Sequence, residues 1–291
     1  MKRFKRITRA LLCAVALSVF VVPALAQSPA IEPCPATPSK PAIPGKQQQI
    51  DTRARLLEID ASVPDDPDVV KLLAPYSERV RELSKVIGRL EGGLNRKGAG
   101  AGPLGNFVTD AVRWQAHEKL SKPIALAIVN AGGLRKNEIA AGDLRASDIF
   151  ELLPFENALV AVDVTGAQLS ELLRIVLRDT QAGARIQFKY DDRDRREFIS
   201  GKLIDETGKE VEIDPNKIYT IVTIDYLLRL QSGAYAILQE AKSTTPLNIT
   251  IRDAVMNYVK SETAAGRPIR ATADNRFVQI GPGPKTPEPP R

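Results

Sequence analysis

The stretch from Ile128 to Leu159 constrains the fold of this chain more than any other, because several rigid requirements follow one another closely. An apolar run at residues 124–129 stops at Asn130, and Gly132–Gly133 come before Arg135. Glycines let backbone N–H groups approach a ligand closely, and a guanidinium group matches the geometry of phosphate and carboxylate. The stretch therefore predicts an anion site where a buried strand ends in a glycine turn.

An aromatic residue follows in a second turn, twenty residues after Arg135. Phe155 stands behind Pro154 and in front of Glu156 and Asn157, a setting typical of turns that leave a ring exposed. An exposed ring can stack on a planar base, so the two turns together indicate a nucleotide site.

Three ordered strings then resemble a known family. They read NAGGLR at 130–135, DIFELLPFEN at 148–157 and ALVAVDVTGAQLSELL at 158–173. They are similar to the C-terminal domain of the 5′-nucleotidase and UDP-sugar hydrolase family, in which the corresponding strings resemble NGGGIR and PFGN. The similarity can be extended from about Asp51 to about Gly281, and it implies an α+β domain that binds nucleotides.

The resemblance also implies a set of ligand-binding residues. These are Asn130, Gly132, Gly133, Arg135, Phe155, Asn157 and Tyr226. Phe155 matches one face of an aromatic clamp, and Tyr226 takes the place of a phenylalanine in a string that resembles T-N-D-F-L-A-x-G-G-D-G-Y. Leu230-Gln231-Ser232 replaces the G-G-D part, which includes the aspartate expected to bind the ribose hydroxyls. Asp225 and Ser232 remain as alternatives for that role.

The glycine-rich segment 98–105 precedes LGNFVTDAV at 104–112, which resembles another family string. An arginine shortly before that string helps to hold the ligand's phosphates in the family. Gly98 falls near that place here, with Arg96 and Lys97 as possible substitutes. Because the segment lacks the lysine and hydroxyl of a phosphate cradle, the alternative is a flexible loop before a helix.

A single histidine limits the chemistry that this chain can perform. The family's hydrolytic centre holds two metals on several histidines in a separate N-terminal domain. His117 alone cannot supply them, and we expect it to lie on the surface. No nucleophile elbow, Cys–His pair or Walker loop is present either. We expect no catalytic residues, no metal ligands and no cofactor in this chain, with divalent metals held by a separately encoded metallophosphatase chain.

The function that follows is the nucleotide- or nucleoside-binding half of a nucleotide-hydrolysing system. Two alternatives stay open: a non-catalytic envelope interaction module that kept the fold but lost nucleotide binding, and a self-sufficient hydrolase.

Residues 1–26 predict a secretory signal peptide. Five basic residues precede or border the apolar segment 10–22, and Ala24–Ala26 fits a cleavage site. A retained membrane anchor is the alternative, although the segment is shorter than the ~20 residues that a span needs. We expect an exported protein, periplasmic or secreted, without a membrane span after cleavage.

Removal of this segment changes the charge of the protein. The 41 basic and 35 acidic residues become 36 and 35, because the signal contributes five basic and no acidic residues. The mature chain is then nearly neutral, which argues against nucleic acid as a partner. Cys34 alone remains, so no internal disulfide can form.

Proline marks the limits of the folded region. Six prolines in 27–50 predict a disordered tether, and five in 281–291 predict a similar tail. Between them, 51–280 should form one mixed-sheet α+β domain. Predicted strands lie at 55–61, 86–90, 124–129, 186–190, 198–204, 217–224 and 277–280, and predicted helices at 68–83, 106–120, 165–177 and 251–262. The apolar stripe of the helix at 68–83 is interpreted as packing against the core.

Overall fold

The computed structural model describes residues 59–60, 62–230, 233–271 and 274–285. The predicted signal peptide, the tether, most of the strand expected at 55–61 and the end of the tail lie outside these residues. The chain divides into a unit up to Val63 and a compact unit from Pro64 onward, and the elements below belong to the second. Within the described ranges, no helix has the length and apolar character needed to cross a bilayer.

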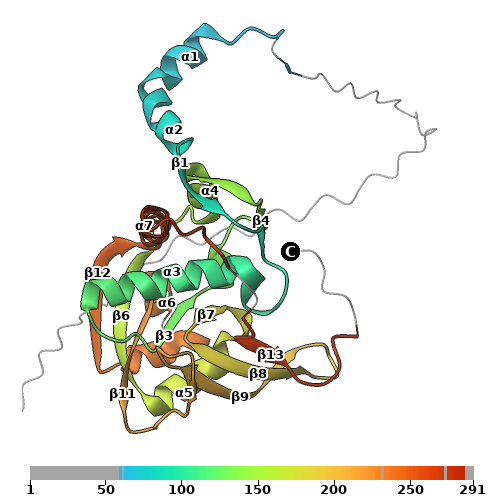
Figure 1. The fold of residues 1–291 in the computed structure, drawn as a ribbon, viewed down its shortest axis with the longest axis vertical. Helices are drawn as coiled ribbons and strands as arrows, with labels where there is room; N and C mark the ends of the chain where they lie inside the picture. Colours follow the sequence, from blue (N-terminus) through green and yellow to red (C-terminus); the bar gives the residue numbers. More distant parts are fainter. Residues whose placement is uncertain (1–58, 61, 231–232, 272–273, 286–291) are drawn as a thin grey trace, which may run out of the picture. The chain divides into compact units, whose positions relative to one another are not determined.

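A five-stranded mixed sheet forms the centre of this unit (Figure 1). In spatial order it consists of β12 (Ser243–Thr250), β6 (Ala158–Thr165), β11 (Ile218–Ile224), β3 (Leu126–Val129) and β7 (Thr180–Ala182). β3 and β11 run parallel, and the other neighbours are antiparallel. All four residues of β3 are buried, as the apolar run predicts.

A second sheet, of four strands, lies beside the five-stranded sheet. Its order is β10 (Glu210–Val211), β9 (Arg196–Ile204), β8 (Ala184–Tyr190) and β13 (Phe277–Gln279). The β8–β9 pair confirms the predicted hairpin, and β13 joins the sheet parallel to β8. Two short pairs complete the sheets: β1 (Val86–Leu90) with β5 (Gly142–Arg145), and β2 (Leu94–Asn95) with β4 (Glu138–Ile139).

Three longer helices cover the sheets. α3 (Gly102–Leu120) crosses the five-stranded sheet and packs beside α7 (Ile251–Ala264), whereas α5 (Gly166–Ile175) contacts β6, β11 and β9 (Figure 1). The shorter helical segments are α4 (Ala146–Leu152), α6 (Asp225–Arg229), η2 (Ala99–Ala101), η3 (Ala131–Gly133), η4 (Val176–Arg178) and η5 (Ala234–Glu240). Mixed sheets with helices of irregular order confirm the predicted α+β class.

The start of α5 follows from its sequence. Thr165 is the N-cap, and its hydroxyl accepts a 3.3 Å hydrogen bond from the Gln168 N–H. The Gln168 side chain accepts a 2.9 Å bond from the Thr165 N–H in return. This reciprocal pair is a capping box, which confirms the predicted cap.

The helix predicted at 68–83 is present, but the expected core packing is wrong. It forms α1 (Pro67–Leu73), η1 (Ala74–Tyr76) and α2 (Ser77–Leu83), and no residue of the three is buried. Pro75 lies at the start of η1, where it lacks the N–H that a continuous helix would need. The exposed apolar side chains are Val69, Val70, Leu72, Leu73, Tyr76 and Val80.

β12 is an element that the sequence analysis did not predict. Only Leu247 within it is buried, because the strand lies at the edge of the five-stranded sheet. Pro246 also interrupts the apolar–polar alternation of the strand, and its missing N–H is tolerated at the edge of a sheet. An edge strand lacks the apolar alternation that periodicity detects.

The glycine-rich segment 98–105 packs tightly and is not an open loop. A Cβ on Gly105 would lie 2.0 Å from the Gly100 carbonyl oxygen, and one on Gly100 would lie 2.2 Å from the Phe277 ring. Gly100 also has a φ of 66°. These glycines allow the start of α3 to approach β13 and β7 closely.

Candidate functional site

The predicted site residues lie at one end of the strands of the five-stranded sheet. β3 and β11 run parallel and end at Val129 and Ile224. Asn130 comes directly after β3 and Tyr226 shortly after β11, so both lie at the same end of the sheet. β6 is antiparallel to β11, and its Leu159 pairs with Ile224. The residues just before β6, including Phe155, therefore lie at that end of the sheet as well. Strand direction and register therefore bring three distant segments of the sequence close together.

A shallow hollow, which encloses no space for a water molecule, lies at this end of the sheet. Its lining residues are Val129, Asn130, Gly133, Leu153, Phe155, Asn157, Ile224 and Ile251. Four of the seven predicted residues are among them: Asn130, Gly133, Phe155 and Asn157. The other lining side chains are apolar, a composition common in small-molecule sites.

Asn130 brings an unused hydrogen-bond acceptor to the hollow. Within the described part of the chain its Oδ1 atom is buried and has no hydrogen-bond partner. A Cβ on Gly133 would lie 3.2 Å from this oxygen, so glycine leaves the carboxamide its space. A buried acceptor without a partner costs ~1–3 kcal/mol, which a ligand N–H or O–H can offset. Gly132 is exposed beside them.

Arg135 and Phe155 lie next to one another. The Cζ atom of Arg135 is 6.0 Å from the Phe155 ring centroid, within range of a cation–π interaction. The Arg135 backbone N–H donates a 2.8 Å bond to the Leu152 carbonyl, and its side chain donates a 3.3 Å bond to the Gly132 carbonyl. An exposed guanidinium and a half-exposed ring thus share one surface.

Tyr226 belongs to α6 and remains accessible. Its side chain is 47% exposed, so it does not turn into the core, but it is not part of the hollow's lining. A ring-to-ring clamp between Tyr226 and Phe155 stays a prediction. Gln231 and Ser232, in the replaced segment, lie outside the described residues.

Asp225 connects two of the converging segments. One carboxylate oxygen accepts a 3.1 Å hydrogen bond from the Ala158 N–H, and the other pairs with Arg229. The carboxylate therefore fixes the start of α6 against the start of β6. This contact competes with the sugar-binding role that the sequence left open for Asp225.

Arg96 supports the glycine turn at 130–135. Its guanidinium donates bonds of 2.7 Å to the Leu134 carbonyl and 2.8 Å to the Ala131 carbonyl. These contacts orient backbone groups of the turn. The expected substitute for a phosphate-binding arginine thus braces the turn that carries Arg135.

Asp179 is a residue that the sequence analysis missed. Its Oδ1 accepts a 3.0 Å bond from the Ala131 N–H, and its Oδ2 accepts a 2.6 Å bond from the Tyr235 hydroxyl. Burial, together with the adjacent Asp179 carboxylate, raises the pKa of Tyr235. Asp179 thereby ties the glycine turn to the segment after α6. Tyr235 matches the last residue of the family string, but nothing in the sequence around Asp179 marks its role.

Arg252 was also missed, and it holds the loop that carries Phe155. Its side chain is buried and donates two 3.0 Å bonds to the carbonyls of residues 153–154 and one of 2.7 Å to Glu156. The guanidinium also lies 4.4 Å from the centroid of the Phe150 ring. A fork of donors on two consecutive carbonyls restrains the loop. A helical arginine two residues after a cap gives no sequence signal for this role.

His117 lies on the surface, as predicted. Its Nδ1 atom is 3.1 Å from the Lys122 carbonyl oxygen, so Nδ1–H is the donor. Among the residues that the structure describes, no group of three or more His, Cys, Asp or Glu side chains is placed to hold a metal ion.

Comparison with known proteins identifies the family of the chain. A family model described as "5′-nucleotidase, C-terminal domain" matches residues 86–240, more than half of the chain. The chain is 28% identical over 149 residues to a 5′-nucleotidase of Vibrio vulnificus, covering 49% of this chain and 26% of that protein. It is 24% identical over 200 residues to a trifunctional nucleotide phosphoesterase protein of Bacillus subtilis, covering 64% of this chain and 13% of that protein.

A solved structure shares the fold. The 5′-nucleotidase precursor of Thermus thermophilus superimposes with a TM-score of 0.61 at 22% identity, over 76% of this chain and 45% of that chain. This chain therefore spans less than half the length of each of these three relatives.

Proposed function

Because the chain belongs to the family of 5′-nucleotidase C-terminal domains, we propose that it binds a nucleotide or nucleoside at the hollow beside Asn130. The base would stack on Phe155, with Tyr226 as the second face of the clamp. Arg135 and the N–H groups of Gly132–Gly133 would hold the phosphate. Asn130 and Asn157 would supply polar contacts to the base or sugar.

The observation that carries this proposal is the shared surface of Arg135 and Phe155. A guanidinium 6.0 Å from an exposed ring offers a charge for a phosphate and a π face for a base in one place. The unsatisfied Asn130 oxygen adds a directional acceptor to the same hollow. Stacking of a base on an aromatic side chain is worth ~1–3 kcal/mol, enough for measurable binding when a phosphate contact is added.

The catalytic half of the system would be a different protein. We place the chain outside the cell membrane, in the periplasm or secreted, on the basis of residues 1–26. There it would present nucleotides to a separately encoded metallophosphatase chain that holds the divalent metals. The single histidine supports this division, since two-metal phosphoryl chemistry uses several ligands.

Calorimetry on the mature chain tests the binding proposal. Adenosine, AMP and a UDP-sugar are titrated in turn, and we expect saturable heat from at least one of them. Arg135→Ala should weaken AMP about tenfold but adenosine little, because only AMP carries the phosphate. Arg174→Ala is the matched control, since Arg174 lies over Phe198 in a similar cation–π pair outside the hollow. No heat from any of the ligands at millimolar concentration would refute the proposal.

An interaction module is the second candidate, and one observation favours it. α1 and η1 expose Val69, Leu72, Leu73 and Tyr76 within a short stretch. Isolated helices of this length are marginal in water, so an apolar face without a cover needs a partner to be stable. A pull-down from the exported fraction, with the full mature chain and with one that begins at Ser84, tests it. A partner retained by the first and lost by the second supports this candidate, and equal recovery contradicts it.

A further inference from the structure

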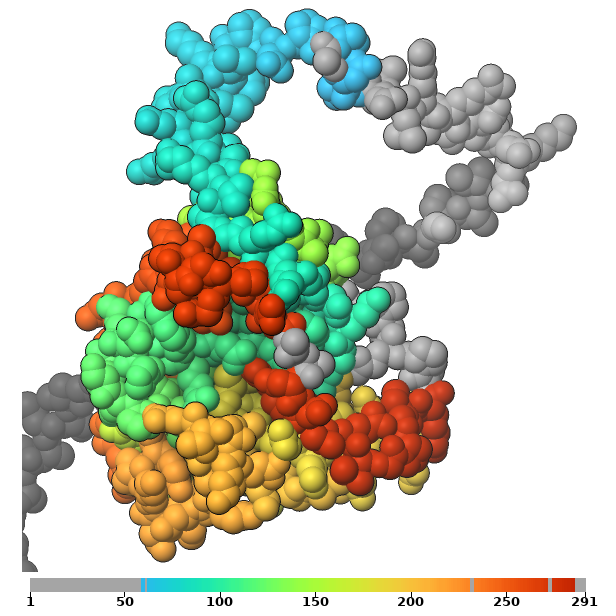
Figure 2. Space-filling model, in the orientation of Figure 1, coloured from blue at the N-terminus to red at the C-terminus, as the bar shows by residue number. Residues whose placement is uncertain are grey.

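A second cleft lies between α3, α7 and the turn that joins β9 to β10. Its volume is about 530 Å³, and it shares no lining residue with the hollow beside Asn130. Figure 2 shows the face of the molecule on which α3, in green, lies between the red-orange α7 and gold-coloured atoms. The proposed nucleotide site makes no use of this cleft.

One wall of the cleft is aromatic. The rings of Trp114 on α3 and Tyr258 on α7 lie 5.6 Å apart between centroids, with an interplanar angle of 60°. Phe107 supports Tyr258 from the core at 6.4 Å, and Asn257 donates a 2.9 Å bond to Gln115 between the same two helices. The wall is therefore preformed, and both its rings line the cleft.

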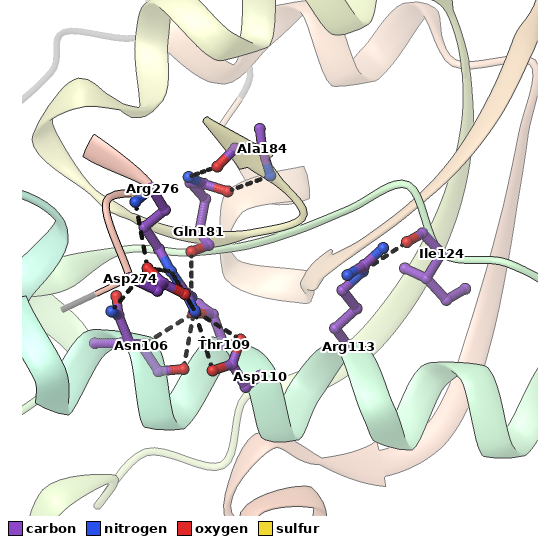
Figure 3. A network of polar contacts seen from close by, with 10 residues as sticks. Asn106, Thr109, Asp110, Arg113, Ile124, Gln181, Ala184, Asp274 and Arg276 are labelled. Atoms are coloured by element: carbon purple, nitrogen blue, oxygen red, sulfur yellow. Dashed lines mark hydrogen bonds and ion pairs between the residues drawn. The ribbon is translucent and has the colours of Figure 1, made fainter. Parts of the chain in front are cut away.

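Asp110 lies beside these rings and is paired with Arg276. Its carboxylate accepts bonds of 3.0 and 3.1 Å from Arg276, which also pairs with Asp274 (Figure 3). Two carboxylates thus share one guanidinium, and burial raises the pKa of Asp110 against the opposing charge of Arg276. The Asp110 side chain is 42% exposed and lines the cleft.

The opposite rim carries two more acids. Asp205 accepts hydrogen bonds from the Thr207 hydroxyl and from the backbone N–H groups of Lys209 and Thr207, and these bonds lower its pKa. Glu206 beside it is exposed. Two basic side chains, Arg113 and His117, also line the cleft, and the Nε of Arg113 donates a 2.7 Å bond to the Ile124 carbonyl (Figure 3).

We propose that this cleft binds a small organic cation, a primary ammonium or guanidinium group on an aliphatic stem. The aliphatic stem lies against Trp114 and Tyr258. The electron-rich faces of these rings also attract the nearby cationic group. The charged end pairs with Glu206 and the exposed edge of Asp110. Three carboxylates line this cleft beside Arg113 and His117, whereas the hollow beside Asn130 has no acidic lining residue, so the two sites suit different ligands.

The tryptophan makes a direct test possible. Trp114 is the one tryptophan of the chain, so its emission reports on this cleft alone. Agmatine is titrated into the full mature chain, with neutral N-butylurea and anionic butyrate as comparison ligands. We expect a saturable change in emission with agmatine, at a Kd on the order of 1 mM or below, and none with the other two. AMP present at saturation should leave the agmatine titration unchanged.

Two variants sharpen the result. Glu206→Gln removes one exposed charge and should weaken agmatine about two- to fivefold. Glu171→Gln is the matched control, since this exposed glutamate of α5 pairs with Arg174 outside the cleft. Trp114→Leu should abolish the heat of agmatine binding in a calorimeter while circular dichroism shows a folded chain. The inference is overturned by no saturable response, by equal responses to agmatine and N-butylurea, or by unchanged affinity in Glu206→Gln.

Discussion

The hydroxyl of Tyr235 donates a 2.6 Å hydrogen bond to Asp179, whose other oxygen accepts the Ala131 N–H. This pair joins the segment after α6 to the glycine turn across 56 positions of sequence. The pair therefore links the two sides of the proposed nucleotide site, and a substitution on one side should affect the other.

Tyr235→Phe should lower both stability and nucleotide affinity. The lost bond to a carboxylate is worth ~1.5–3 kcal/mol, and the partly buried Asp179 loses one of its donors. Urea unfolding measures the first effect and calorimetry with AMP the second. Tyr76→Phe is the control, because Tyr76 is exposed on η1 and should change neither value. An unaltered unfolding midpoint in Tyr235→Phe would contradict this role.

Arg252→Lys should loosen the loop that carries Phe155. A lysine keeps the charge but cannot donate to two carbonyls and Glu156 at once, so we expect a loss of about 1–3 kcal/mol in the free energy of unfolding. Binding of adenosine should weaken as well, since the ring loses its fixed position. Arg267→Lys is the matched control, because Arg267 also makes a forked contact, with Glu262, but on the surface. Equal effects of the two substitutions would argue against a special role for Arg252.

Asp274→Asn should remove a pH-dependent part of the stability. Burial opposes ionisation of Asp274, but hydrogen bonds and charge from Arg276 outweigh it, and the pKa lies below the ordinary 3.8. A carboxyl with a lowered pKa stabilises the fold above its unfolded value, and this contribution is lost as the pH falls through the lower, folded value. The stability difference between wild type and variant should therefore be constant near neutral pH and shrink below about pH 4. Asp110 keeps Arg276 paired in the variant. A difference that grows on acidification would show the opposite linkage.

Gly105→Ala should destabilise the protein strongly. The new Cβ would lie 2.0 Å from the Gly100 carbonyl oxygen, so the backbone at the start of α3 has to shift. Overpacking of this kind costs roughly 1–3 kcal/mol or more. Gly92→Ala is the matched control, because a Cβ there meets nothing within 4 Å. Thermal unfolding of both variants distinguishes a packed segment from the flexible loop that the sequence also allowed.

The sequence predicted the elements whose signals are local. Buried β3 and the turn after it follow from an apolar run and two glycines, and the start of α5 follows from Thr165 and Gln168 three positions apart. Phe155 was expected to be exposed because of its turn, and it is. The motif order also identified the family.

The tertiary structure decided what depends on distant partners. Asp179 and Arg252 have no marked sequence pattern, because their partners lie 48 to 99 positions away and meet them through strand order. The same cause explains the unpredicted edge strand β12 and the exposed face of α1 and α2, since burial depends on what packs opposite. At the stretch from Ile128 to Leu159, the sequence therefore determined which groups are offered to a ligand. The fold decided how these groups are held, because each side chain is positioned by contacts with residues that are distant in the sequence.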